Sequence, residues 1–181
     1  MKKIGKIFVF AALAMASYSA SAELAPQWQK GTILANVELG LEPVGTAVSV
    51  DYVLVDSWWQ GHFTVGGEID YGHNSYSYWK ENRIGVTPRV TYGLNITPQF
   101  EVHAMFGMGF AYQKDKYDAV SHGSYFGVEV TSEAYSTTST YLFSNDFVGC
   151  RYFFSDNVSV MGEVGYSNGF PDIRAGLSFK F

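Results

Sequence analysis

Apolar and polar residues alternate along most of the chain beyond about residue 30. The clearest case is 173–181, IRAGLSFKF, in which every odd-numbered residue is apolar. A period of two places the apolar side chains on one face of a β-strand. No amphipathic 3.6-residue pattern persists for three turns, so the sequence predicts an all-β fold.

Seven further segments alternate in the same way. They are 33–41, 48–54, 63–71, 84–94, 100–110, 148–154 and 158–166. Pro88 falls on the apolar face of its segment and removes a ladder donor, so a bulge or weak pairing is expected there. Asp146, just before 148–154, also falls on the apolar side. Segments of roughly ten residues have the length of a tilted strand that crosses a bilayer.

The alternation alone does not decide whether the apolar face lines a soluble barrel or contacts lipid. The polar face is rich in Gly and Ser, which suits the narrow lumen of an eight-stranded barrel. Aromatic residues gather at two sets of strand ends, as in the girdles at the two bilayer interfaces. These residues are Trp58 and Trp59 at one rim, and Tyr76, Tyr78 and Trp79 at the other.

The connections between segments also alternate in length. The segments 56–61, 97–99 and 155–157 are short, whereas 73–82 and 113–138 are longer. Short turns inside and long loops outside are typical of membrane barrels, although 42–46 and 167–171 would be unusually short outer loops. The sequence therefore predicts an eight-stranded antiparallel up-and-down transmembrane β-barrel.

The start of the chain has the pattern of a secretory signal peptide. A basic stretch at 1–6 precedes an apolar run at 7–16 and the small residues Ala20-Ser21-Ala22, which form an A-x-A cleavage pattern. The run is too short to span a bilayer as a helix. We expect a signal peptide at 1–22 and a barrel domain at 23–181 in the bacterial outer membrane. The alternative is a buried N-terminal helix.

Composition excludes several other classes. Of the 181 residues, 17% are aromatic and 16% are charged, which is incompatible with disorder. The pI near 5.3 does not fit a nucleic-acid binder. A single Cys excludes a disulfide framework and a Cys-clustered metal site. No phosphate-binding loop or HExxH motif is present, and we expect no cofactor.

The last strand carries a specific resemblance. Arg174-Ala175-Gly176-Leu177-Ser178-Phe179-Lys180-Phe181 is similar to the C-terminal signal read by the barrel-assembly machinery. Together with the signal peptide and eight alternating segments, it resembles small outer-membrane barrels of the OmpA/OmpX type. The resemblance implies an assembly signal made of Arg174, Gly176, Phe179 and Phe181. It also implies the lipid bilayer, lipopolysaccharide, the assembly machinery and periplasmic chaperones as partners.

The polar faces carry charges that should point into the lumen. Unpaired charges in a narrow, partly dry interior are costly, so we expect a network of ion pairs. A small ion or proton path is the alternative. The residues concerned are Glu38, Asp51, Glu68, Asp70, Arg89, Glu101, His103, Arg151, Glu163, Arg174 and Lys180.

Some eight-stranded barrels are enzymes, so a catalytic site is an alternative for this chain. The segment Gly165-Tyr166-Ser167-Asn168 resembles part of the site of outer-membrane lipid A deacylases. Gly165 stands where those enzymes have a His, so the proton acceptor is missing. We predict a non-enzymatic barrel with an envelope structural role. A lipid-modifying enzyme and a soluble periplasmic ligand-binding barrel remain the alternatives.

The longest connection, 113–138, is the best candidate for contact with the outside. It alternates at Phe126, Val128 and Val130, so the flanking strands are expected to continue beyond the bilayer as a ribbon. An exposed strand edge can capture a partner by adding a strand. The candidate contact residues for surface adhesion or an extracellular partner are Tyr117, Tyr125, Phe126 and Tyr135. The alternative is a passive ribbon or a loop folded onto the rim.

Overall fold

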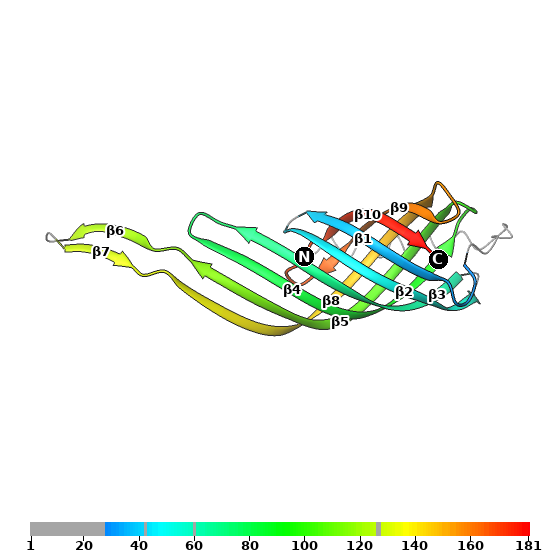
Figure 1. Cartoon of the computed structure of the whole chain (residues 1–181), viewed down its shortest axis with the longest axis horizontal. Helices are drawn as coiled ribbons and strands as arrows, with labels where there is room; N and C mark the ends of the chain where they lie inside the picture. Colours follow the sequence, from blue (N-terminus) through cyan, green and yellow to red (C-terminus); the bar gives the residue numbers. More distant parts are fainter. Residues whose placement is uncertain (1–27, 42, 60, 126–127) are drawn as a thin grey trace, which may run out of the picture.

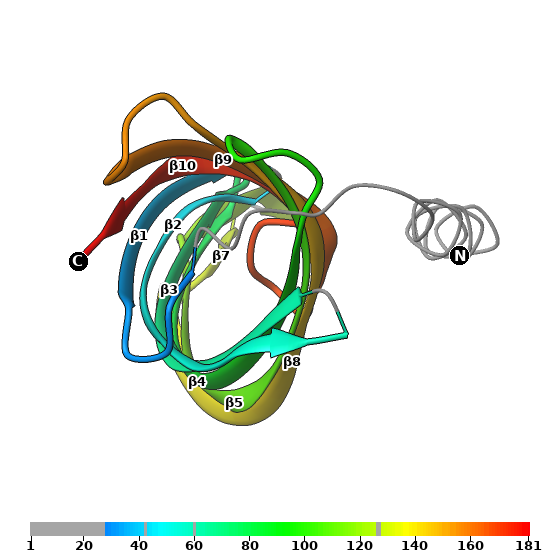
Figure 2. The same cartoon turned by 90° about the vertical axis from the view of Figure 1, so that its right-hand side faces the viewer.

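Eight antiparallel strands form a closed ring, with the first strand paired to the last (Figure 2). The computed structural model describes residues 28–41, 43–59, 61–125 and 128–181, and gives the backbone alone for 120–125 and 128–131. The strands of the ring are β1 (Ile33–Leu41), β2 (Val44–Trp58), β3 (Gly61–Ser75), β4 (Trp79–Asn95), β5 (Phe100–Tyr117), β8 (Tyr135–Phe153), β9 (Val158–Ser167) and β10 (Ile173–Lys180). The predicted fold class is confirmed. In the described part of the chain, no helix is long and apolar enough to cross a membrane.

One side of the barrel is much taller than the other. β1, β9 and β10 have 9, 10 and 8 residues, whereas β5 and β8 have 18 and 19. A separate hairpin of β6 (Val120–Tyr125) and β7 (Val128–Ser132) extends this side further. Figure 1 shows the result as a long ribbon that leaves the barrel and ends at β6 and β7. The expected ribbon is therefore present.

Several strands extend beyond the predicted segments. The stretch 73–82 is mostly strand, since β3 and β4 pair as far as Ser75 and Lys80. Likewise, β5 and β8 pair as far as Tyr117 and Tyr135. Expecting a loop at 73–82 was wrong because backbone hydrogen bonds continue the ladder after the apolar alternation ends, whereas the extension of β5 and β8 is part of the expected ribbon. Outside lipid, the outer side chains no longer need to be apolar.

The apolar faces point outward and the polar faces inward. Leu39 and Phe110 are 67% and 65% exposed, whereas Glu38 and Asp51 are 1% and 2% exposed. A soluble barrel has the opposite arrangement, with an apolar interior. Asp146 also faces outward and is half-buried, and its Oδ2 lies 3.3 Å from the donating Ser144 hydroxyl.

Glycines on the inner face leave room for the charged side chains. A Cβ added at Gly93 would lie 2.3 Å from a carbon of the His62 ring, and one at Gly149 would lie 2.7 Å from His103 Nε2. Both distances are shorter than a van der Waals contact, so larger residues at these positions would displace the imidazoles. The high glycine content of the polar face therefore reflects close approach inside a narrow lumen.

Pro88 weakens one ladder without shifting it. β4 and β5 pair from Trp79 to Val86 and again from Arg89 to Asn95 in the same register, with Thr87 and Pro88 left out. The expected weak pairing is confirmed. The register shifts of the barrel lie instead between β2 and β3, near Trp58.

At the ribbon end, the aromatic residues predicted for a girdle lie where β3 ends and β4 begins. Tyr76 and Trp79 belong to a stack of rings on the extended strands. At this end the outward row next to the ribbon includes Tyr71 and Tyr112, which are both exposed. At the opposite rim, Trp58 and Trp59 are exposed as expected.

Candidate functional site

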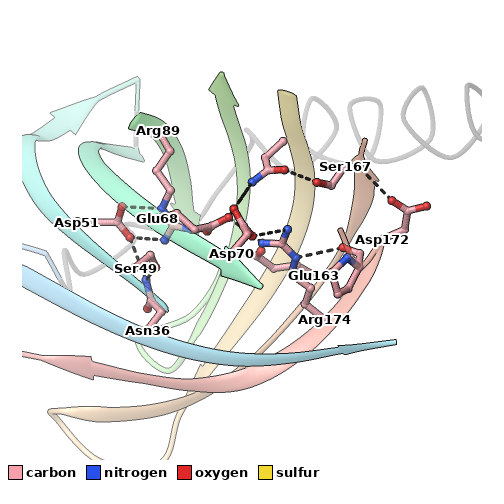
Figure 3. A network of polar contacts seen from close by, with 12 residues as sticks. Asn36, Ser49, Asp51, Glu68, Asp70, Arg89, Glu163, Ser167, Asp172 and Arg174 are labelled. Atoms are coloured by element: carbon pink, nitrogen blue, oxygen red, sulfur yellow. Dashed lines mark hydrogen bonds and ion pairs between the residues drawn. The ribbon is translucent and has the colours of Figure 1, made fainter. Parts of the chain in front are cut away.

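The centre of the lumen is organised around the Glu68 carboxylate of β3. Arg89 Nη1 donates to Glu68 Oε2, and Arg174 Nη1 donates to Glu68 Oε1 at 2.8 Å. Arg89 also makes a bidentate contact with Asp51, at 2.8 Å and 2.5 Å. Arg174 lies 3.0 Å from Asp70 Oδ1. Figure 3 shows the two guanidinium groups on either side of the Glu68 carboxylate.

Neutral side chains extend this network to both sides. The Asn36 amide donates to Ser49 and to Asp51, each at 2.9 Å. The Asn145 amide donates to Glu68 at 2.8 Å and to Asp70 at 3.1 Å. These amides supply hydrogen bonds without adding charge, which lets three carboxylates share two arginines.

A second cluster fills the half of the lumen nearer the chain ends. The Trp28 indole N–H donates to Glu101 at 2.7 Å, and Arg151 donates to the other oxygen of Glu101 at 2.7 Å. His103 lies 3.3 Å from Glu101 through Nδ1 and 2.8 Å from Glu163 through Nε2. Two carboxylates, an imidazole and a guanidinium are thus linked across β5, β8 and β9.

The structure places the predicted lumen residues as follows. All except Lys180 are buried on the inner face. Lys180 is half-buried at the end of the barrel, where its Nζ lies 5.7 Å from the centre of the Trp28 ring. Glu38 departs from the expected pairing, because neither of its carboxylate oxygens has a hydrogen-bond partner among the described residues. Nor does any group of three or more described His, Cys, Asp or Glu side chains suit a metal ion.

Sequence reasoning missed several members of the network. Asn145 and Ser167 carry no charge and were overlooked, although Ser167 donates to Asn145. His62 lies at the edge of its segment and contacts Glu101 at 3.8 Å. Trp28 precedes the first strand, and no periodic pattern marks it. The alternation of inner and outer residues along β3 would have placed His62 on the inner face.

Apolar clusters cover the charged lumen at both ends. Near the chain termini, Trp28 is 1% exposed and packs with Phe153 and Leu34. At the ribbon end, Phe170 lies in the connection between β9 and β10 and packs against Phe143, with ring centres 4.8 Å apart. This connection is therefore a lid rather than an outward loop.

An arginine on β4 holds the lid. Arg83 Nη1 donates to the Gly169 carbonyl at 2.6 Å, and its Nε donates to Gln113 at 3.0 Å. Arg83 also pairs with Glu81. Gly169 adopts a φ of 95°, which favours glycine, and this turn brings Phe170 inward over the lumen.

The ribbon has a free strand edge. β8 pairs with β5 from Tyr135 to Tyr152, but with β9 only from Asn145 to Phe153. The residues 135–144 therefore have a strand partner on one side alone within the described structure. Residues 135–140 are all exposed. Such an edge presents unpaired backbone N–H and C=O groups to a partner.

Four aromatic rings stack across the base of the ribbon. The ring centres of Tyr76 and Trp79 are 4.4 Å apart, and those of Trp79 and Tyr117 are 6.1 Å apart. Tyr117 and Tyr135 follow at 4.5 Å, with their planes within 11° of parallel. Stacked cross-strand pairs stabilise a sheet. Of the other two predicted contact residues, the Tyr125 side chain and the whole of Phe126 lie outside the described residues.

The family model for the outer membrane protein beta-barrel domain matches residues 8–181. The chain belongs to this family of outer-membrane β-barrels. The family assignment places the barrel in the outer membrane, with its apolar outer face in the lipid bilayer. The predicted OmpA/OmpX-type resemblance is confirmed at the level of the family.

Solved structures of small outer-membrane barrels are similar to this chain at low identity. A de novo designed transmembrane β-barrel is 16% identical, with a TM-score of 0.49, and covers 85% of this chain and 98% of the design. Ail of Yersinia pestis is 13% identical, with a TM-score of 0.46, and covers 84% of this chain and 100% of Ail. The N-terminal barrel of Pseudomonas aeruginosa OprF is 18% identical, with a TM-score of 0.44, and covers 83% of this chain and 96% of the OprF barrel. No curated protein matches the chain.

The segment that resembles a deacylase site has different surroundings in this outer-membrane barrel. Ser167 is buried in the lumen and its hydroxyl donates to the Asn145 side-chain carbonyl. A serine nucleophile needs an adjacent base that can accept its proton, and an amide oxygen is not such a base. The segment His73-Asn74-Ser75 also places a histidine two residues from a serine, and there His73 Nδ1 lies 3.0 Å from Asn82 Oδ1.

Proposed function

We propose that the protein is a non-enzymatic outer-membrane barrel with an envelope structural role, and that it binds a surface partner through its ribbon. The observation that carries this proposal is the free edge of β8 at 135–144. In bacterial barrels the longer connections face the outside of the cell. The ribbon then stands on the extracellular side, and the turns near both chain ends face the periplasm.

The lumen supports a structural rather than a conducting role. Its charges are paired around Glu68 and Glu101, and apolar clusters lie across both ends. Burial of so many charged groups is tolerable only when they are hydrogen-bonded. The amide partner of Ser167 likewise argues against a lipid-modifying enzyme.

The proposal includes the biogenesis partners of the family. A cleaved signal peptide at 1–22, which lies outside the described residues, would deliver the chain to the periplasm. Chaperones and the barrel-assembly machinery would then recognise the last strand through Arg174, Gly176, Phe179 and Phe181. In the folded barrel Phe181 is 75% exposed on the outer surface.

The extended partner would add a strand to β8. Neighbouring residues of an antiparallel strand direct their N–H groups to opposite sides. Of Thr137→Pro and Thr138→Pro, one therefore removes an N–H that faces β5, and the other removes one on the free edge. Both side chains are exposed, so the two variants differ mainly in which hydrogen bond is lost.

The experiment compares these variants in a laboratory Gram-negative host, by counting bacteria attached to an epithelial cell monolayer. Host cells without the protein set the background. We expect that the variant with unchanged unfolding free energy loses attachment, because its proline blocks the free edge. Native attachment by that variant would rule out strand addition.

The predicted aromatic contacts are tested in the same assay. Tyr135→Ala removes an exposed ring at the end of the aromatic stack, whereas Tyr135→Phe keeps the stack and removes the hydroxyl. If the rings contact the partner, Tyr135→Ala lowers attachment and Tyr135→Phe does not. Equal attachment by both variants and the native protein would limit the stack to a structural role.

A further inference from the structure

One carboxylate of the lumen is buried without a partner. Glu38 of β1 is 1% exposed, and neither of its oxygens has a hydrogen-bond partner among the described residues. Its side chain lies over Gly176 of β10, where an added Cβ would come within 2.9 Å of Glu38 Cγ. On the β2 side Glu38 pairs with Ala47. Neither neighbour has a polar side-chain atom to offer, and an uncompensated buried carboxylate is costly.

The guanidinium groups that attract Glu38 are fully engaged elsewhere. They belong to Arg89 and Arg174. The three side-chain nitrogens of Arg89 contact two other carboxylates. Those of Arg174 contact two other carboxylates and a backbone carbonyl. Neither arginine therefore has a nitrogen left to donate to Glu38.

The centre of the lumen also holds more negative than positive side chains. The imidazole of His103 contacts Glu163 and can compensate at most one carboxylate. Two guanidinium groups and this imidazole leave at least two of the five carboxylates at the centre without a cationic side chain. The five are Glu38, Asp51, Glu68, Asp70 and Glu163.

Other buried oxygens around Glu38 lack donors as well. Asn36 lies two residues earlier on the same inner face and pairs with Ser178 of β10. Asn36 Oδ1, Ser178 Oγ and Glu163 Oε2 are all buried without a hydrogen-bond partner among the described residues. Carboxylate and amide oxygens are ligands of hard metal cations. What this group of oxygens lacks is a positive charge.

We infer that Glu38 and Glu163 bind a monovalent metal cation of the alkali type inside the lumen. Asn36 Oδ1 and Ser178 Oγ supply neutral oxygen ligands. No group of three described acidic, His or Cys side chains converges on a metal position, which favours a single charge over Ca²⁺, whose sites draw on several carboxylates. The cation is resident rather than conducted, because apolar clusters lie across both ends of the lumen. The inference does not depend on the ribbon or its partner.

The test measures how urea unfolding of the full-length barrel in phosphatidylcholine vesicles depends on sodium. Sodium chloride replaces choline chloride at constant ionic strength and neutral pH, because choline is too large for the packed lumen. Equilibrium unfolding and refolding lets the cation enter as the chain folds. Once the site is filled, about a tenfold increase in sodium should lower the unfolding equilibrium constant about tenfold. Glu38→Gln keeps the size of the side chain and should abolish this dependence.

A matched control separates the site from a general charge effect. Glu133→Gln removes one exposed carboxylate outside the lumen and should keep the native dependence on sodium. Gel mobility with and without boiling shows that each variant folds. Equal dependence of the native protein and Glu38→Gln would overturn the inference.

Two other results would also overturn it. One is a native stability that responds to neither sodium nor potassium, as expected if Glu38 carries a proton or contacts only water. The other is a response to calcium chloride but to neither alkali cation, which would contradict the single charge.

A second measurement uses the native protein alone, so it does not depend on the folding of a variant. The barrel is refolded and crystallised with rubidium, a heavier alkali cation that is located by its anomalous scattering. We expect a rubidium position beside Glu38 and Glu163. Rubidium absent from the lumen would overturn the inference.

Discussion

Removing the negative charge of Glu68 tests the lumen network at its centre. Glu68→Gln keeps the size of the side chain but replaces one carboxylate oxygen with an NH2 group. The carboxylate accepts from Arg89, from Arg174 at 2.8 Å and from Asn145 at 2.8 Å. In the variant one amide oxygen remains as an acceptor, and the new NH2 group faces a guanidinium donor.

The expected loss of stability depends on the contacts that the two arginines retain in the variant. Arg89 retains its bidentate contact with Asp51, and Arg174 retains Asp70. The loss is therefore one to two hydrogen bonds to a charged group, each worth about 1.5–3 kcal/mol. Breaking a buried ion pair typically costs about 3–5 kcal/mol. We predict that the free energy of unfolding falls by about 3 kcal/mol.

The assay is urea unfolding in lipid vesicles, followed by tryptophan fluorescence and by gel mobility without boiling. Glu133→Gln is the control, because Glu133 is exposed between β7 and β8 and its replacement should change stability by less than about 0.5 kcal/mol. A loss below about 1 kcal/mol for Glu68→Gln, or one equal to that of the control, would refute the view that this network stabilises the barrel.

Three further predictions concern the barrel ends and the glycines. Trp28→Ala should lower the free energy of unfolding by about 3–5 kcal/mol, since the ring is 1% exposed, whereas Trp59→Ala, with an 84% exposed ring, should change it much less. Phe170→Ala should lower it by about 3 kcal/mol and should speed backbone hydrogen exchange in the β9–β10 connection, and unchanged exchange would contradict the lid. Gly93→Val should prevent folding of the barrel because its Cβ meets the His62 ring, so gel mobility should not change on boiling. Gly67→Val, with open space around its Cβ, should fold and keep the change in mobility.

The sequence predicts the barrel well because one physical pattern runs through every strand. Lipid outside and a hydrogen-bonded lumen inside impose a strict period of two, which is visible in 173–181 and confirmed for β10. The weak pairing at Pro88 was also predictable, because a proline lacks the backbone N–H and so weakens a β-ladder wherever it occurs. These features depend on neighbours in sequence or on a regular lattice of strands.

The remaining features depend on contacts that no local pattern encodes. Trp28 reaches Glu101 across 73 residues, and Phe170 turns inward because Arg83 holds the Gly169 carbonyl. The ribbon strands lose their apolar alternation above the bilayer, so their extent could not be predicted from periodicity. Which lumen charges pair is equally hidden, since Glu68 and Glu38 look alike in the sequence while Glu38 has no described hydrogen-bond partner.

The central claim is that the apolar face contacts lipid and the charged face lines the lumen. Its most direct test is a spin label at Val37→Cys, midway along β1 and 47% exposed, in a Cys150→Ser background. The same label at Thr138→Cys serves as the water-exposed reference on the ribbon. In vesicles, the label at position 37 should collide readily with lipid-soluble oxygen and rarely with a water-soluble nickel complex, whereas position 138 should show the reverse. Frequent nickel collisions at position 37 would mean that this face does not contact lipid, and the account of the barrel would be wrong.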